Sequence, residues 1–342
     1  MDVPPVSYGK VLVGDATAVS RAFANWQDQP VDQDLEEGAT DLGDLPVQQT
    51  TLGNCTEVTG PGTFLGRAQR TLRFEPSRVQ GWRFKRNDLP ESLPINVSVA
   101  NVWTTARNIV LCSGSPHNYM RMVEHIIALK VGLGLDNLLI RVDSGDPPLF
   151  DRGSLDLVEA VDAAGIVPQS DPAVYLTVRE PVTVAGANGS FLTFLPAEDG
   201  RRLLFVDCAV DFRNAIGKQR IRFPVTPKVF RYGAQARTNT TLWMMLYCKT
   251  IGMIFADVRN LGYTRRNILV AGPHCYFNRP KLWHQGKSLE AVWHRATLDL
   301  LAAIALIDRG RLAGRVISYK SGHTLDVVMI RELYERDLLV RL

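Results

Sequence analysis

The sequence predicts an α+β fold of two similar layers, each a β-sheet with helices, packed so that the helices are sandwiched between the sheets. The chain has 342 residues, 46% of them hydrophobic and 22% charged, which is enough for two domains of roughly 150 residues. Runs that alternate apolar and polar residues precede helical stretches, and this order of elements occurs twice. We therefore expect an acidic N-terminal arm at 1–47, a first α+β domain at 48–170 and a second at 171–342.

The elements of the first layer begin after residue 50. Residues 70–74, 82–85 and 95–99 alternate apolar with polar side chains, as half-buried strands do. A helix is expected next, over residues 119–131. The layer ends with a short buried strand, a turn rich in Pro and Gly, and a helix, at 137–142, 143–148 and 154–164.

The second layer repeats this order. Four strands are expected first, at 173–178, 182–184, 190–194 and 203–210. A long apolar helix follows over 289–307. The layer ends with a strand, a turn and a helix, at 314–318, 320–322 and 323–336.

Charge is distributed unevenly along the chain. Residues 1–47 contain nine acidic residues against Lys10 and Arg21, a balance of −7, so the remaining 295 residues carry +11. A basic body favours an anionic ligand such as a phosphate ester, a nucleotide, nucleic acid or a lipid head group. We interpret residues 1–47 as an arm outside the core, partly helical around 16–26, and expect its charge to draw it onto the body. Disorder, a cover over the active site and docking of an unidentified protein partner stay open for the arm.

Several classes of protein are not expected. No stretch reaches the roughly 18 apolar residues that a membrane helix needs, so no transmembrane segment is predicted and only transient contact with a membrane surface stays open. The first residues do not resemble a secretion signal, which favours a cytoplasmic location. The five cysteines form no CxxC pair, which argues against a disulfide framework and against a thiolate metal site.

Three of the six histidines lie in surroundings that suit a catalytic site. His125 follows Glu124 early in a predicted helix. His294 lies in the long apolar helix with Asp299 close behind it. His323 opens the last helix after a Ser-Gly turn. The other three histidines are interpreted as ordinary residues of turns.

These residue types are the ones that a catalytic zinc site needs. Three imidazole or carboxylate ligands leave a fourth position of the metal open for water. A carboxylate such as Glu124 can take a proton from that water, and a protonated histidine such as His323 can stabilise a developing oxyanion. From spacing alone, however, such histidines are more often ordinary residues at a helix boundary.

Two long motifs are specific enough to indicate a family. Residues 122–137, MVEHIIALKVGLGLDN, resemble the hallmark helix of the UDP-3-O-acyl-N-acetylglucosamine deacetylases of lipid A synthesis. Residues 319–325, YKSGHTL, resemble their C-terminal signature. Shorter motifs fall in the family's order at 59–62, 84–90, 150–154 and 236–238. The resemblance covers about residues 48–340 and implies the two-layer fold described above.

The resemblance also implies a chemistry and a substrate. The cofactor would be Zn²⁺ and the substrate a UDP-linked, acylated amino sugar. The metal ligands would be His125, His294 and Asp299. Glu124 would be the general base that activates water on the metal.

The same resemblance assigns roles to four further positions. His323 would stabilise the tetrahedral oxyanion or protonate the leaving amine, and Thr238 would donate a hydrogen bond to that oxyanion. Lys320 and Arg295 would help to hold the nucleotide diphosphate. Residues 242–247 would begin a hydrophobic passage for the acyl chain, with plain core packing as the alternative.

The sequence departs from the family's pattern at the site. The family places its second histidine and its aspartate at H-x-x-x-D, whereas His294 and Asp299 are one residue further apart. Five residues advance an α-helix by about 500°, which leaves the two side chains about 140° apart. Either a π-type bulge reunites them, or Asp299 is not a ligand. Ala303 replaces the family's next acidic residue, which orients the C-terminal histidine; Phe64 and Asn239 also depart from the pattern, and Arg295 replaces a lysine.

The sequence therefore supports two hypotheses about function. The first is a zinc-dependent amidohydrolase that removes the N-acetyl group of a UDP-linked, 3-O-acylated glucosamine. The alternative is a diverged, catalytically altered or inactive relative that binds a nucleotide sugar or acts as an interaction or regulatory protein. A nucleic-acid-binding protein is not expected, because no aromatic and basic motif of a known reader is present.

Overall fold

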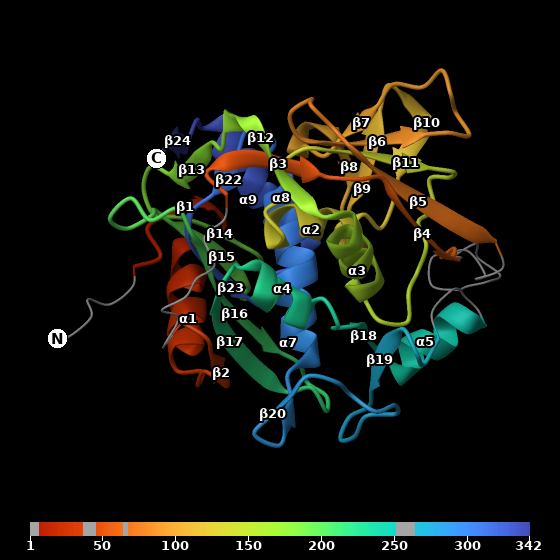
Figure 1. Ribbon diagram of the computed structural model, residues 1–342. Helices are drawn as coiled ribbons and strands as arrows, with labels where there is room; N and C mark the ends of the chain where they lie inside the picture. The colour runs from red at the N-terminus through yellow and green to blue at the C-terminus, as the bar shows by residue number, and fades with distance from the viewer. Residues whose placement is uncertain (1–6, 37–45, 64–67, 251–263) are drawn as a thin grey trace.

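The architecture consists of two β-sheets with helices between them. The computed structural model describes residues 7–36, 46–63, 68–250 and 264–342 and confirms the α+β class. The larger sheet has seven strands in the order β1-β14-β15-β23-β16-β17-β2, and the smaller has five in the order β4-β5-β11-β6-β7. In Figure 1 the larger sheet lies at the lower left and the smaller at the upper right.

The bounds of the elements are as follows. The larger sheet comprises β1 Lys10–Val13, β14 Val182–Ala185, β15 Phe191–Leu195, β23 Gly314–Tyr319, β16 Leu204–Asp211, β17 Lys218–Pro224 and β2 Gln33–Asp34. The smaller sheet comprises β4 Thr56–Pro61, β5 Gln69–Pro76, β11 Leu138–Val142, β6 Trp82–Arg86 and β7 Ile95–Asn96. The helices are α1 Ala16–Gln27, α2 Glu124–Gly132, α3 Leu155–Ala164, α4 Pro227–Gly233, α5 Leu242–Lys249, α7 Glu290–His294, α8 Leu301–Ala305 and α9 His323–Glu335. A π-helical turn, Arg295–Leu300, joins α7 to α8, and a 3₁₀ turn lies at Val99–Asn101.

The other strands form small sheets of two or three strands. They are β10-β9-β8 (Ser115–Met120, Val110–Ser113, Val102–Thr104), β12-β3 (Ile166–Pro172, Gln48–Leu52), β22-β13-β24 (Arg311–Leu312, Tyr175–Val178, Leu339–Arg341), β18-β19 (Thr238–Thr241, Ile268–Ala271) and β20-β21 (Trp283–His284, Lys287–Ser288). The expected helix at 119–131 begins only at Glu124, because the residues before it form β10.

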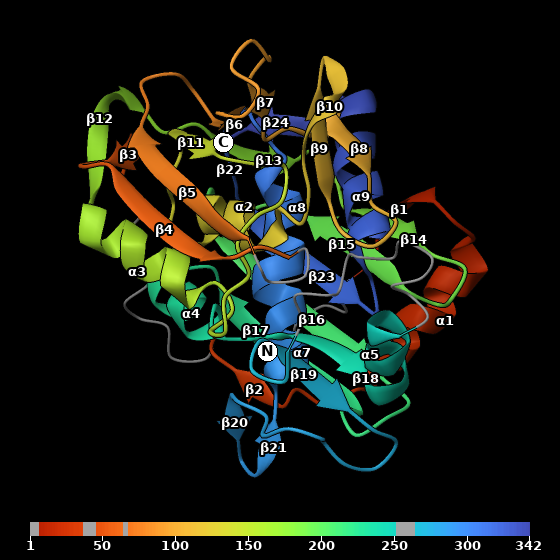
Figure 2. The ribbon, with the colours of Figure 1, turned by 90° about the vertical axis from the view of Figure 1, so that its right-hand side faces the viewer.

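The central helices α2 and α7–α8 pack between the two sheets (Figures 1 and 2). Strand β11, expected as a short buried strand, buries alternate residues in the core that it shares with the central helices. Strands β14 and β15 are buried on both faces, because helices cover the larger sheet from both sides. The side chains of both sheets meet those of the central helices in one continuous core.

The N-terminal segment differs from the expected arm. Helix α1 is confirmed, but it packs Val19, Phe23 and Trp26 onto the outer face of the larger sheet. Strands β1 and β2 form the two edges of that sheet. The interpretation of the segment as an arm outside the core is therefore wrong for its described residues. The apolar stripe of α1 repeats at i, i+4 and i+7, and the excess of acidic residues around it concealed this signal.

The predicted electrostatic contact between this segment and the basic body is confirmed. Three of its acidic side chains form ion pairs with basic residues of the second half: Asp32 with Lys287 at 2.6 Å, Asp34 with Arg222, and Glu36 with Arg315 at 2.8 Å. The boundaries at 47/48 and 170/171 stay predictions. Among the described residues, no helix combines the length and the apolar character needed to cross a bilayer.

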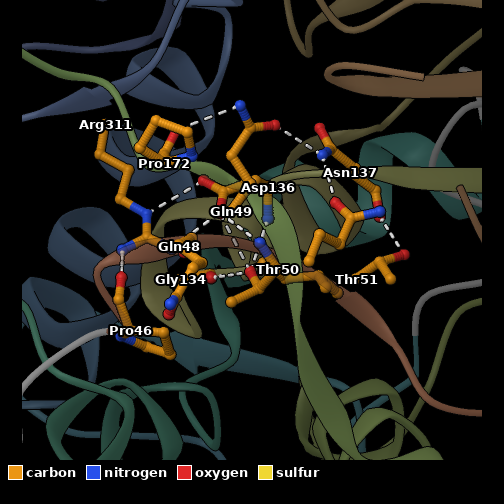
Figure 3. Close-up of polar contacts among 12 residues, drawn as sticks. Pro46, Gln48, Gln49, Thr50, Thr51, Gly134, Asp136, Asn137, Pro172 and Arg311 are labelled. Carbon is orange, nitrogen blue, oxygen red and sulfur yellow. Dashed lines mark hydrogen bonds and ion pairs between the residues drawn. The ribbon is translucent and has the colours of Figure 1, made fainter. Parts of the chain in front are cut away.

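A buried polar cluster joins the two halves at the end of α2 (Figure 3). The Arg311 guanidinium donates to both carboxylate oxygens of Asp136, at 2.7 and 3.0 Å. It also donates to the main-chain carbonyls of Pro46 and Gln48, at 2.8 and 3.2 Å. Asp136 in turn accepts from the main-chain N–H of Thr50 at 2.8 Å. One arginine of the second half thus holds two segments of the first.

We expect Asp136→Ala to destabilise the protein by about 2–3 kcal/mol, because it leaves the mostly buried Arg311 without its carboxylate. The control is Asp156→Ala, which removes a more exposed ion pair with Arg152 and is expected to cost about 0.5 kcal/mol or less. Urea unfolding measures both. Equal losses in the two variants would contradict a structural role for the Asp136–Arg311 pair.

Candidate active site

A cavity of about 540 Å³ opens where α2, the π-helical turn, β18 and the start of α9 meet. It contains six of the eight residues that the sequence singles out, from segments far apart in the chain. Its lining consists of Arg107, Asn108, Met122, Glu124, His125, Thr238, Asn239, Thr240, Met244, Met245, Ile268, His294, Asp299 and His323.

The start of α2 places two of these side chains in the cavity wall. Met122, just before the helix, has a left-handed backbone with φ 49°, which few residues with a side chain adopt. Its N–H donates to the Asn108 side chain at 3.4 Å, which supports this sharp entry. Glu124 and His125 are the first two residues of the helix. The chain therefore turns abruptly so that both side chains reach the cavity.

Two imidazoles converge on one point of the cavity. The Nε2 atoms of His125 and His294 are 3.4 Å apart, and the Thr238 hydroxyl lies 2.9 Å from Nε2 of His294 and 3.4 Å from that of His125. Burial, and secondarily the neighbouring His294, lower the pKa of His125 to about 3. His125 is therefore neutral at physiological pH, as a metal ligand must be.

The separation of the two nitrogens fits a metal ion. A tetrahedral zinc with Zn–N bonds of about 2.0–2.1 Å holds two nitrogens about 3.3 Å apart. The 3.4 Å between the Nε2 atoms of His125 and His294 agrees with that value. Nevertheless, no group of three or more His, Cys, Asp or Glu side chains within the described parts of the chain is arranged as a ready metal site.

Asp299 reaches the site through the π-helical turn. Of the two alternatives for the H-x-x-x-x-D spacing, the structure has the bulge: residues Arg295–Leu300 form a π-helix. The carboxylate lies 3.5 Å from Nδ1 of His294, so it faces the nitrogen opposite the one that points at His125. Burial alone would raise the pKa of Asp299, but His294 and His323 outweigh it and hold the pKa well below its usual range. Its predicted role as third metal ligand stays a prediction.

Glu124 and His323 form a carboxylate–imidazole pair beside the two converging histidines. Nε2 of His323 lies 3.7 Å from Glu124 and 3.8 Å from Asp299. Burial raises the pKa of the Glu124 carboxyl. Burial also acts to lower the pKa of His323, but Asp299 and Glu124 outweigh it and raise that pKa overall. The pair therefore places two groups that can hold or give a proton side by side in the cavity.

Comparison with known proteins identifies the family of the chain. A family model described as UDP-3-O-acyl N-acetylglycosamine deacetylase matches residues 49–335. The chain belongs to this family. A relative named UDP-3-O-acyl-N-acetylglucosamine deacetylase in Trichormus variabilis is 28% identical over 84% of this chain and 98% of its own length. One of the same name in Brucella ovis is 28% identical over 83% of this chain and 94% of its own.

Arg295 departs from the role that the family resemblance implied. Its guanidinium is buried and donates to Asp326 at 2.5 Å, to Ser321 at 2.7 Å and to Ser318 at 3.5 Å. It does not line the cavity. The expectation that Arg295 holds a diphosphate is therefore wrong, because its charge is already neutralised by a fully buried carboxylate. The ion pair instead ties the π-helical turn to α9, which begins at His323.

Lys320 also lies outside the cavity lining, next to the start of α9. Its backbone has φ 53°, and its ammonium lies 5.7 Å from the centre of the Tyr319 ring. Contact between Lys320 and a diphosphate stays a prediction. Phe64, another departure from the family's pattern, lies outside the described residues.

The sequence pattern missed Arg107 and Asn108, which lie in the loop between β8 and β9 and line the cavity. Nothing periodic marks this loop, so only the fold brings it to the site. The alternative that residues 242–247 are plain core is wrong, because Met244 and Met245 line the cavity and much of the helix is exposed.

Arg295→Met is expected to cost about 3–5 kcal/mol of stability, because Asp326 is then buried without a cation. The double variant Arg295→Met, Asp326→Leu removes both charges and should lose less than Arg295→Met alone. Urea unfolding of the two single variants and the double variant provides the measurement. A double variant that loses the sum of the single losses would show that the two side chains act independently.

Proposed function

We propose that the protein is a zinc-dependent deacetylase that hydrolyses the N-acetyl group of a UDP-linked, 3-O-acylated glucosamine, a step of lipid A synthesis in the cytoplasm. The observation that carries the proposal is the 3.4 Å approach of the Nε2 atoms of His125 and His294, with Glu124 and His323 beside them in the same cavity. Membership of the deacetylase family supports the choice of substrate.

In this proposal His125, His294 and Asp299 hold the zinc ion. The two imidazoles present their Nε2 atoms to one point, and the Asp299 carboxylate lies on the same helix as His294. When bound, the metal would polarise the amide carbonyl and lower the pKa of a water molecule.

Glu124 is the proposed general base. Its buried carboxylate takes a proton from the attacking water, whose oxygen forms a bond to the carbonyl carbon of the acetyl group. The raised pKa of Glu124 makes it a stronger base than an exposed glutamate. The Thr238 hydroxyl, 2.9 Å from Nε2 of His294, donates a hydrogen bond to the oxyanion that then develops.

His323 completes the hydrolysis as the general acid. Its raised pKa favours the protonated imidazole, which can give a proton to the leaving amine as the C–N bond breaks. Acetate and the free amine of the sugar are the products. Asp299 and Glu124 face Nε2 of His323 and favour the cationic form before the reaction.

The side chains that line the cavity indicate where the acyl chain and the diphosphate of the substrate would bind. Met122, Met244, Met245 and Ile268 provide an apolar wall that suits an acyl chain. Arg107 is the single Lys or Arg among the described lining residues and, with Lys320 outside, is a proposed contact for the diphosphate.

A second candidate is a relative that binds the nucleotide sugar without hydrolysing it. The position of Asp299 favours it, since that carboxylate contacts Nδ1 of His294 rather than the Nε2 atom that approaches His125. Metal content and hydrolysis separate the two candidates.

The purified protein is expected to contain one zinc per chain and to release acetate from the UDP-linked substrate. His125→Ala should lose both the zinc and the activity, because one of the converging nitrogens is removed. Glu124→Gln should keep the zinc but lose about 10²–10⁴-fold in kcat. The control is His274→Ala, an exposed histidine outside the cavity. A metal-free protein without hydrolysis would overturn the proposal, and a metal-free protein that binds the UDP-sugar would support the second candidate.

Asp299→Ala tests the third ligand by itself. If Asp299 binds the metal, this variant should lose zinc as His125→Ala does. Metal analysis after dialysis against a chelator measures the loss. Full retention of zinc with reduced kcat would contradict ligation and would show that the carboxylate acts only on Nδ1 of His294.

A further inference from the structure

Helix α5 presents a cluster of large apolar side chains to solvent. Trp243, Met244, Leu246 and Tyr247 are 78%, 52%, 42% and 40% exposed. The helix lies at the periphery of the molecule beside β18 and β19 (Figures 1 and 2). Single exposed apolar residues are ordinary, but four within one helix of eight residues mark an interaction surface.

The inward face of the same helix is already occupied. Leu242 and Met245 pack against Ile268 and Val270 of β19. The spacing of these two residues, i and i+3, places them on one side of α5. Trp243, Leu246 and Tyr247 therefore belong to a separate, outward face whose burial is not needed to attach the helix to the fold.

The chain around α5 is basic. Residues 238–289 contain one acidic residue and seven Lys or Arg, although the whole chain has 35 acidic against 39 basic residues. Arg265 and Arg266 are exposed and immediately precede β19, the strand against which α5 packs. Exposed aromatic and apolar side chains thus occur in a basic stretch of the chain that is poor in acidic residues.

We infer that the outward face of α5, with Arg265 and Arg266, docks onto the surface of an anionic lipid bilayer. Trp and Tyr favour the interface between water and hydrocarbon, and each Lys or Arg near an anionic membrane adds attraction. A second copy of the chain fits less well, because two copies of this basic stretch would repel each other.

Docking in this way has a consequence for the cavity. Met244 and Met245 of α5 line the cavity, so its apolar wall belongs to the element that touches the membrane. This step rests on the proposed function: an acylated substrate would then move from the bilayer to the site without exposing its chain to water. The docking itself does not depend on hydrolysis.

Sedimentation of the full-length protein with lipid vesicles tests the inference. We expect binding to vesicles of phosphatidylcholine with 30% phosphatidylglycerol, at least tenfold stronger than to phosphatidylcholine alone and weakened by high salt. Trp243→Gln, Leu246→Gln should bind about tenfold more weakly. Arg265→Gln, Arg266→Gln should lose a similar factor together with most of the salt dependence.

The matched control is Trp103→Gln, Leu93→Gln, which changes residues 57% and 62% exposed elsewhere on the molecule. It should bind like the unchanged protein. Equal loss in the control, or equal binding to both kinds of vesicle, would overturn the inference. Light scattering would also overturn it if the protein were a dimer that Trp243→Gln, Leu246→Gln dissociates. Because binding is measured without substrate, its failure is distinct from failure of the proposed deacetylation.

Discussion

The contact between α2 and the α7–α8 helix is the constraint on which the site depends. These helices lie between the two sheets, and each contributes one histidine to a point where their Nε2 atoms are 3.4 Å apart. Neither layer alone contains both rings. The close approach requires the apolar packing of the central helices and, at the far end of α2, the Asp136–Arg311 pair that joins the two halves. Core packing thus sets the distance between the groups that would do chemistry.

The charges around these histidines follow from burial. His125 is kept neutral because burial and a second imidazole disfavour its charged form. His323 is driven toward its charged form because two carboxylates face it. Arg295 supplies the counter-charge for buried Asp326 and leaves none for a ligand. Two histidines of the same cavity, His125 and His323, therefore favour different protonation states, because each has different neighbours.

Much of the fold and of the site could be predicted from the sequence, and the failures have physical causes. Periodicity located most strands and helices, and the two family motifs located His125 and His323. Sequence spacing could not decide between an α-turn and a π-turn after His294, because the choice depends on the packing around Asp299. It also could not place the guanidinium of Arg295, whose partner Asp326 is 31 residues away in sequence. A helix in the N-terminal segment could be predicted, but the excess of acidic residues around it hid the apolar stripe by which it packs onto the larger sheet.

The position of Asp299 depends both on the helix geometry after His294 and on the charges in the cavity. A carboxylate one turn further along would fall at Ala303, which is buried among apolar neighbours and offers no polar group. The π-helical turn instead sets Asp299 within 3.5 Å of His294 and 3.8 Å of His323. With Glu124, the cavity then holds two carboxylates, together with Arg107 and one imidazole that favours its charged form. A divalent cation at the point where the Nε2 atoms of His125 and His294 meet would add positive charge beside these carboxylates. The extra residue after His294 is thus compatible with a metal site because the helix absorbs it as a π-turn.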